Sequence, residues 1–167
     1  MLPDHKPFLD TLLPKLESTP GALDHLFLDH ICYRTESVAE YESLRDELAI
    51  DNELLVESII GGRRIATFRL AEPLVYQHRS IPLLELPEPK PGRFYGSGWE
   101  HVEFVTDRPL AAFAEHIPTL LAPSATDFDR GGMTKARNAD FRVKLGDGMS
   151  VKFHEWSLER VIAEELG

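Results

Sequence analysis

The sequence predicts an α+β fold made of two βαβββ modules with curved, mixed sheets, plus one helix at the N-terminus. The first observation is a repeated stretch, LDHICYRT at residues 28–35 and WEHVEFVT at residues 99–106. In both, an acidic residue and a histidine precede alternating apolar residues. The two histidines, His30 and His101, lie 71 positions apart in a chain of 167 residues. A spacing close to half the chain length indicates an internal duplication.

Shorter repeated motifs support the duplication. Gly61-Gly62 is followed 70 positions later by Gly131-Gly132, and Phe68-Arg69-Leu70 is followed 73 positions later by Phe141-Arg142-Val143. The order of predicted helices and strands is also the same in both halves. A sheet of one module is too small to bury its own face, so two such sheets are expected to complete one another.

The first half begins with apolar residues at helical spacing. They predict a helix within residues 3–18, with Pro14 inside it. Alternation over residues 29–34 predicts a strand. Residues 37–48 then form an amphipathic pattern in which Ser37 and Glu40 match a capping box, which predicts a second helix.

Three strands are expected after this helix. Apolar runs at 54–60 and 65–70 flank Gly61-Gly62-Arg63-Arg64 and predict a β-hairpin. The run 81–86 predicts a strand that ends at Pro87, and the Pro- and Gly-rich residues 87–98 predict a linker between the halves.

The second half repeats this order. We expect a strand at 99–106, a helix at 109–121, a weak strand at 126–128, strands at 141–145 and 149–153, and a final helix at 157–166. The chain is therefore predicted to be one domain over residues 1–167. It would consist of a helical extension at 1–22, a first module at 23–90 and a second module at 91–167 with its C-terminal helix.

Composition and charge exclude several classes of partner. A formal net charge of −10 opposes nucleic acid and anionic membranes, so we expect neither as a partner. Cys32 is the single cysteine, which fits a reducing compartment. The first residues do not resemble a signal peptide, and no run of about 20 apolar residues is present. We therefore expect a cytoplasmic protein.

Four stretches carry a resemblance to a known superfamily, in which they occur in the same order: LDHICYRT, LLELPEP, GWEHVEFVT and DGMSVKFHEWSLERVI. Through them the sequence resembles the vicinal oxygen chelate superfamily of glyoxalases, bleomycin-resistance proteins and extradiol dioxygenases. The resemblance covers most of residues 23–162 and is closest to the YecM-type proteins, which also suit the N-terminal helix. It implies that the two modules form cupped sheets around a cleft.

The resemblance also implies a divalent metal ion in the cleft, bound by side chains from the first and last strands of each module. It assigns His30, Glu85 and His101 as ligands. Imidazole and carboxylate bind borderline divalent metals, and Zn, Ni, Fe and Mn are not distinguished by this set.

The fourth ligand position departs from the pattern. It falls on Lys152, whose ammonium group cannot bind a cation. His154 lies two residues further on the same face of the strand, so we take it as the fourth candidate. Glu155, on the opposite face, is the alternative.

Other polar residues share these strands. Glu103 is on the face of His101 and is a candidate general base, although it can instead pair with Arg34 or Arg142. Arg34, Arg69 and Arg142 are candidates for binding an anionic substrate. Cys32 shares the face of His30, but a buried cysteine is usually a small core residue.

Two functions are compatible with the sequence. The first is a metal-dependent enzyme of isomerase, lyase or oxygenase type acting on a small polar substrate that chelates the metal. The second is a metal-free module that binds a small ligand, as bleomycin-resistance proteins do, and Lys152 at a ligand position favours it. We expect a small-molecule substrate or ligand, and either a monomer or a homodimer.

Overall fold

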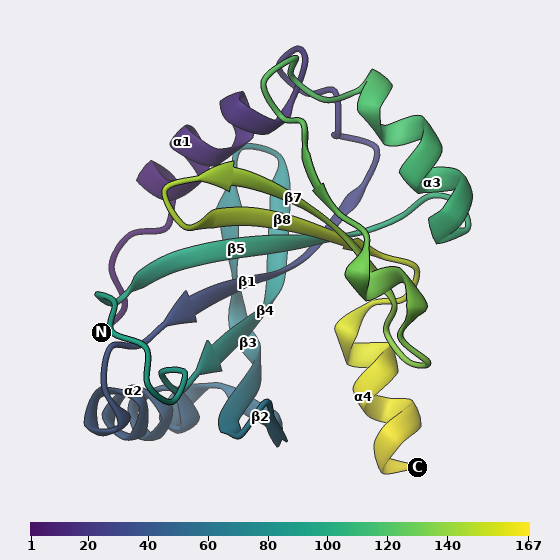
Figure 1. Ribbon diagram of the computed structural model, residues 1–167. Coiled ribbons are helices and arrows are strands. Elements are labelled where there is room, and N and C mark those ends of the chain that lie inside the picture. The colour runs from purple at the N-terminus through teal and green to yellow at the C-terminus, as the bar shows by residue number, and fades with distance from the viewer. The chain divides into compact units, whose positions relative to one another are not determined.

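The structure is a computed structural model that describes residues 1–167. The chain divides into two units, one formed by Met1–Asp4 and His30–Glu100, the other by His5–Asp29 and His101–Gly167. Figure 1 shows the chain from the purple N-terminus to the yellow C-terminus. Each unit holds the greater part of one βαβββ module.

The first module consists of one helix and four strands. These are β1 (Phe27–Arg34), α2 (Val38–Asp51), β2 (Glu53–Ile60), β3 (Arg63–Tyr76) and β4 (Arg79–Pro87). The strands lie in the order β2-β3-β4-β1. β1 and β4 are parallel, whereas the β2–β3 and β3–β4 pairs are antiparallel. This mixed sheet is the one that the sequence predicts.

Local sequence signals explain the helix and hairpin of this module. The Ser37 hydroxyl accepts a hydrogen bond from the Glu40 amide at 3.1 Å and so caps α2. α2 buries Tyr41 and Leu44 and contacts β3 and β4. Gly61 and Gly62 have φ values of 61° and 79°, which a two-residue hairpin loop requires and which glycine adopts without strain.

The second module repeats the arrangement. It consists of β5 (Gly98–Val105), α3 (Leu110–His116), β6 (Asp127–Asp129), β7 (Asp140–Gly146), β8 (Met149–His154) and α4 (Leu158–Leu166), with short 3₁₀ turns at Ile117–Thr119 and Gly131–Thr134. Its strands lie in the order β5-β8-β7-β6. β5 and β8 are parallel, and the other two pairs are antiparallel. The parallel pair of the first and last strands is thus common to both modules.

The core of the second unit is aromatic and is covered by two helices. Phe153 of β8 packs with Phe104, Phe113 and Phe141 at ring-centroid distances of 5.7, 5.0 and 6.4 Å. α3 contacts β7, and so does α1 (Lys6–Leu16), whose buried leucines form its apolar face. The N-terminal helix therefore belongs to the second unit.

The element boundaries differ most from the prediction at α3 and β3. α3 ends at His116 and continues only as a 3₁₀ turn, because Pro118 cannot continue an α-helix. β3 extends to Tyr76, beyond the predicted end at residue 70, because Leu74, Val75 and Tyr76 pair with β4. None of the helices has both the length and the apolar character that crossing a membrane requires.

Candidate functional site

In the first unit, the parallel pair β1–β4 brings a histidine and a carboxylate together. Cys32 of β1 lies in register with Glu85 of β4, and His30 lies in register with Leu83. The Nε2 atom of His30 is 3.8 Å from Oε2 of Glu85. The His30 side chain is 1% exposed and that of Glu85 is 17% exposed, so the pair is largely shielded from water.

In the second unit, Glu103 lies at the centre of a cluster of titratable side chains. Its Oε1 atom is 2.5 Å from the Lys152 ammonium and 3.2 Å from Nε2 of His101. Its Oε2 atom is 3.5 Å from Nε2 of His154. The Glu103 and His154 side chains are 6% and 0% exposed. One buried carboxylate is therefore in contact with two imidazoles and one ammonium group.

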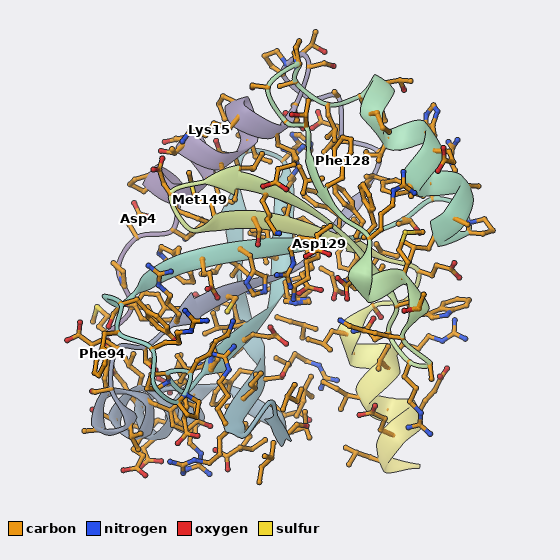
Figure 2. All side chains as sticks on the ribbon, in the orientation of Figure 1. Asp4, Lys15, Phe94, Phe128, Asp129 and Met149 are labelled. Carbon is orange, nitrogen blue, oxygen red and sulfur yellow. The ribbon has the colours of Figure 1, made fainter.

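Strand register produces this cluster. Glu103 on β5, Lys152 on β8, Arg142 on β7 and Asp129 on β6 are neighbours in successive strands, so they form one row across one face of the sheet. Asp129 is labelled in Figure 2 and marks the β6 end of this row. His101 and His154 lie two residues from members of the row and so point to the same face.

The two modules place opposite charges at equivalent positions. In the first, neutral Cys32 faces the acid Glu85, whereas in the second the acid Glu103 faces the base Lys152. Lys152 therefore occupies the place on the last strand that Glu85 has in the first module. The lysine at the expected fourth ligand position is thus accompanied by the Glu103 carboxylate on the neighbouring strand.

Asp29 is a buried member of the site region that sequence reasoning missed. Its Oδ2 atom lies 3.8 Å from Nε2 of His154 and accepts a hydrogen bond of 2.9 Å from the Leu158 amide at the start of α4. The other ring nitrogen of His154, Nδ1, contacts the backbone oxygen of Trp156. The acid before each repeated histidine was visible in the sequence, but only the histidines were assigned roles.

The equivalent acid of the second repeat, Glu100, belongs to the first unit. Its carboxylate lies 3.8 Å from Nη1 of Arg34, and the Cys32 thiol is 3.9 Å from its Oε2 atom. Cys32 is therefore a buried thiol beside a carboxylate, in addition to being a small core residue.

The three candidate substrate-binding arginines have different surroundings. Arg34 donates to the Gly96 carbonyl at 3.0 Å and lies over the Tyr95 ring. Arg69 forms an ion pair with Glu53 of β2. Arg142 alone lies in the Glu103 row. Within its own unit, Glu103 contacts Lys152 and the two histidines.

Glu155, the alternative fourth ligand, is directed elsewhere. Its Oε1 atom accepts a hydrogen bond of 2.5 Å from the Leu110 amide, at the first residue of α3. This contact satisfies one of the unpaired amides at that helix terminus. His154, by contrast, lies beside Glu103, so the structure gives the two adjacent residues separate surroundings.

The donor set fits a borderline divalent cation. His101 and His154 offer two imidazole nitrogens within one buried cluster beside the Glu103 carboxylate, and His30 with Glu85 offers one nitrogen and one carboxylate. The Lys152 ammonium disfavours a metal ion, because this positive charge lies beside the Glu103 carboxylate and repels a cation.

Comparison with known proteins identifies a family and several similar proteins. A family model described as YecM protein matches residues 1–165. Protein YecM of Escherichia coli (strain K12) is 34% identical over 149 residues, which cover 84% of this chain and 79% of that protein. An uncharacterized protein of Haemophilus influenzae is 30% identical over 83 residues, which cover 50% of this chain and 44% of that protein.

A solved structure described as "Structural Genomics, Protein EC4020" is also similar. It superposes with a TM-score of 0.74 at 31% sequence identity, and the match covers 95% of this chain and 85% of that one.

Proposed function

The chain belongs to the YecM family. Because it also buries imidazole and carboxylate groups side by side, we propose that it is a divalent-metal-dependent enzyme. Its substrate would be a small polar molecule that binds the metal through oxygen atoms. The observation that carries the proposal is the position of the Glu103 carboxylate between His101 and His154, at 3.2 and 3.5 Å.

The proposed metal ligands are His30 and Glu85 in the first unit and His101 and His154 in the second. When bound, a divalent ion at such ligands polarises a carbonyl or enolate oxygen of the substrate. Reactions of isomerase, lyase and oxygenase type all use this kind of activation, so the proposal names a class of site rather than one reaction.

Glu103 is proposed to move the substrate proton as a general base. The Lys152 ammonium at 2.5 Å compensates the charge of the carboxylate while no substrate is present. Arg142, in the same row, is the arginine best placed to bind an anionic group of the substrate, because Arg34 and Arg69 are engaged by Glu100 and Glu53.

A metal-free ligand-binding module is the second candidate, and one contact favours it. Lys152 occupies the carboxylate that a cation would otherwise approach, so the charge of Glu103 is compensated without a metal. In this case the histidines and Glu103 would hold the strands together and bind polar groups of a ligand.

The metal content of the purified protein separates the two candidates. Protein prepared without chelator and without an affinity-tag nickel step is measured by mass spectrometry, alongside His30→Ala and His101→Ala variants. His78→Ala is the matched control, because His78 is exposed in the turn between β3 and β4. The proposal predicts metal in near-stoichiometric amount in the wild type and the control, and its loss in the two site variants.

The opposite result supports the second candidate. If the wild type contains no metal and takes up none of Mn, Fe, Ni or Zn on titration, the enzyme proposal is wrong. Circular dichroism of each variant shows whether the fold is retained, so loss of metal is not confused with unfolding.

A further inference from the structure

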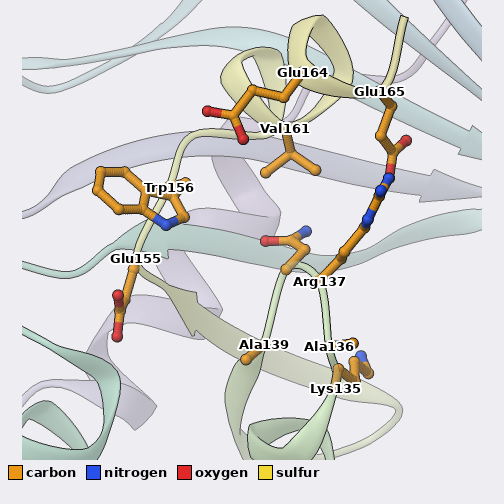
Figure 3. Close-up of a pocket in the computed structure, with 10 residues that line it drawn as sticks. Lys135, Ala136, Arg137, Ala139, Glu155, Trp156, Val161, Glu164 and Glu165 are labelled. Carbon is orange, nitrogen blue, oxygen red and sulfur yellow. The ribbon is translucent and has the colours of Figure 1, made fainter.

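A pocket in the second unit lies apart from the Glu103 cluster. Its volume is about 380 Å³, within the range of small-ligand sites. Residues 135–139 before β7, the Glu155-Trp156 pair after β8, and Val161, Glu164 and Glu165 of α4 line it. Figure 3 shows these residues, with Trp156 and Val161 on the α4 side and Ala136 and Ala139 on the loop side.

The charged groups that line this pocket are already paired within the protein. Lys135, Arg137, Glu164 and Glu155 each have a partner, so none needs a ligand of opposite charge. The pairs are Lys135 with Asp140, Arg137 with Glu165 at 3.8 Å, Glu164 with Arg160 at 2.9 Å, and Glu155 with the Leu110 amide at 2.5 Å. The lining therefore favours a neutral ligand.

Asn138 is the polar residue of the lining that these pairs leave unused. Its Oδ1 atom is buried and has no hydrogen-bond partner. Its backbone is left-handed, with φ of 44°, a conformation that asparagine tolerates better than most residues. A buried carbonyl oxygen without a partner is costly, so a ligand with a matching donor would stabilise it.

Trp156 provides the apolar contact surface. It is 48% exposed, and the Arg160 guanidinium lies over its ring at 3.6 Å from the centroid. Val161, Ala136 and Ala139 add apolar area around the pocket. Trp156 and Asn138 line the same pocket, so one planar ligand can contact both.

We propose that this pocket binds a small, neutral, planar ligand with a carboxamide-like group, which pairs with the Asn138 side chain while its ring packs against Trp156 and Val161. The chemical class is an aromatic or heteroaromatic amide. None of the proposed metal ligands lines the pocket, although the backbone of Trp156 contacts His154.

Three probes of the same shape and different charge test the proposal. Benzamide is neutral, benzoate is an anion and benzamidinium is a cation. Their binding is followed by ¹H–¹⁵N NMR, because the chain has two tryptophans and hence two indole N–H signals. Trp99 belongs to the other unit and donates its indole N–H to the Asp4 carbonyl at 3.3 Å, so its signal is an internal reference.

The proposal predicts that benzamide shifts the Trp156 indole and Asn138 side-chain signals and leaves Trp99 unchanged. Benzoate and benzamidinium should bind at least tenfold more weakly. Asn138→Gly keeps the left-handed backbone while removing the carboxamide, so it should weaken benzamide binding about fivefold without loss of the folded spectrum.

Three outcomes would overturn the proposal. Equal shifts of both tryptophan signals would mean non-specific binding. A charged probe that binds as tightly as benzamide would contradict the charge argument. Undiminished benzamide binding in Asn138→Gly would remove the role of the carboxamide.

Discussion

At the scale of single residues, Glu103 determines the character of the candidate site. It is buried, it contacts two histidines, and its charge is compensated by Lys152 from the neighbouring strand. The histidines and Glu103 were identified from the sequence, whereas the partner of Glu103 was not. Lys152 is 49 residues away in the chain, and only the parallel register of β5 and β8 places it beside the carboxylate.

The first prediction concerns this ammonium group. Lys152→Gln should raise the affinity for Mn²⁺ at least tenfold, because it removes a positive charge that lies beside the proposed ion site. Isothermal titration calorimetry measures the change. Lys144→Gln on neighbouring β7 is the control, since Lys144 is half exposed and pairs with Asp129 instead. An unchanged affinity in Lys152→Gln would show that the ammonium does not compete with the metal.

Asp29 gives a second prediction at this scale. Asp29→Ala should lower the free energy of unfolding by about 2 kcal/mol, because the Leu158 amide loses its buried acceptor. Asp29→Asn keeps an acceptor oxygen and should cost less. Urea denaturation measures both, with Asp10→Ala on the exposed face of α1 as control. Equal losses in Asp29→Ala and Asp10→Ala would contradict the structural role of the Asp29 contact.

At the scale of elements, the sequence predicted the helices and strands wherever local chemistry defines them. The α2 start is an example, because Ser37 provides the cap that the motif indicates. The second half of the predicted capping box differs, since the Glu40 carboxylate accepts from the Glu36 amide rather than from that of Ser37. The end of β3 was not predicted, because β3 resumes its pairing with β4 only after a register shift between Arg69 and Leu74. This pairing depends on the folded chain and has no local sequence signal.

The cap leads to a prediction for α2. Ser37→Ala should lower the free energy of unfolding by about 1 kcal/mol, because the Glu40 amide loses its acceptor. Ser43→Ala is the matched control, since Ser43 is exposed within the same helix and caps nothing. Thermal denaturation followed by circular dichroism tests this, and a smaller loss in Ser37→Ala than in the control would contradict it.

A junction between α2, β3 and the end of β4 predicts a pH effect. Arg64 donates to Glu88 from its backbone amide at 2.6 Å and from Nε at 2.7 Å, and its Nη2 atom donates to Glu42 of α2. The Arg64 side-chain hydrogen bond holds the pKa of the Glu88 carboxyl below its usual range. Glu88 therefore stabilises the fold fully above its unfolded pKa, and this contribution is lost as the pH falls through the lower folded pKa.

Glu88→Gln should accordingly lower the free energy of unfolding by about 1 kcal/mol at pH 7. The difference from the wild type should shrink as the pH falls below about 4.3, where the carboxyl of the unfolded chain becomes protonated. Urea denaturation over a pH series measures this. Glu72→Gln, at an exposed position of β3, should show no such trend. A difference that stays constant between pH 7 and pH 3 would contradict the ionic role of Glu88.

At the scale of the whole molecule, the internal duplication is the main result that sequence alone provided. Both modules have the predicted order of elements, and in both the first and last strands are parallel. The duplication does not extend to charge, because Glu85 and Lys152 occupy equivalent places. Sequence spacing revealed that a lysine replaces the expected carboxylate. That Glu103 lies beside this lysine and compensates its charge depends on strand pairing.

The grouping of α1 with the second unit was also beyond the sequence. Its leucine pattern predicts a buried face, but many apolar surfaces satisfy such a pattern equally well. The contact with β7 is specific to the folded chain. The position of Asp29 beside α4 has the same origin, since 129 residues separate it from Leu158.

The most direct test of the proposed function is anomalous diffraction at the manganese absorption edge, from crystals grown with Mn²⁺. The proposal predicts a peak within bonding distance of the imidazole nitrogen of His101, with the Lys152 ammonium displaced from Glu103. A map without a peak at His101, His154, His30 or Glu85, in which Lys152 remains on Glu103, would contradict the metal-dependent function and favour the metal-free binding module.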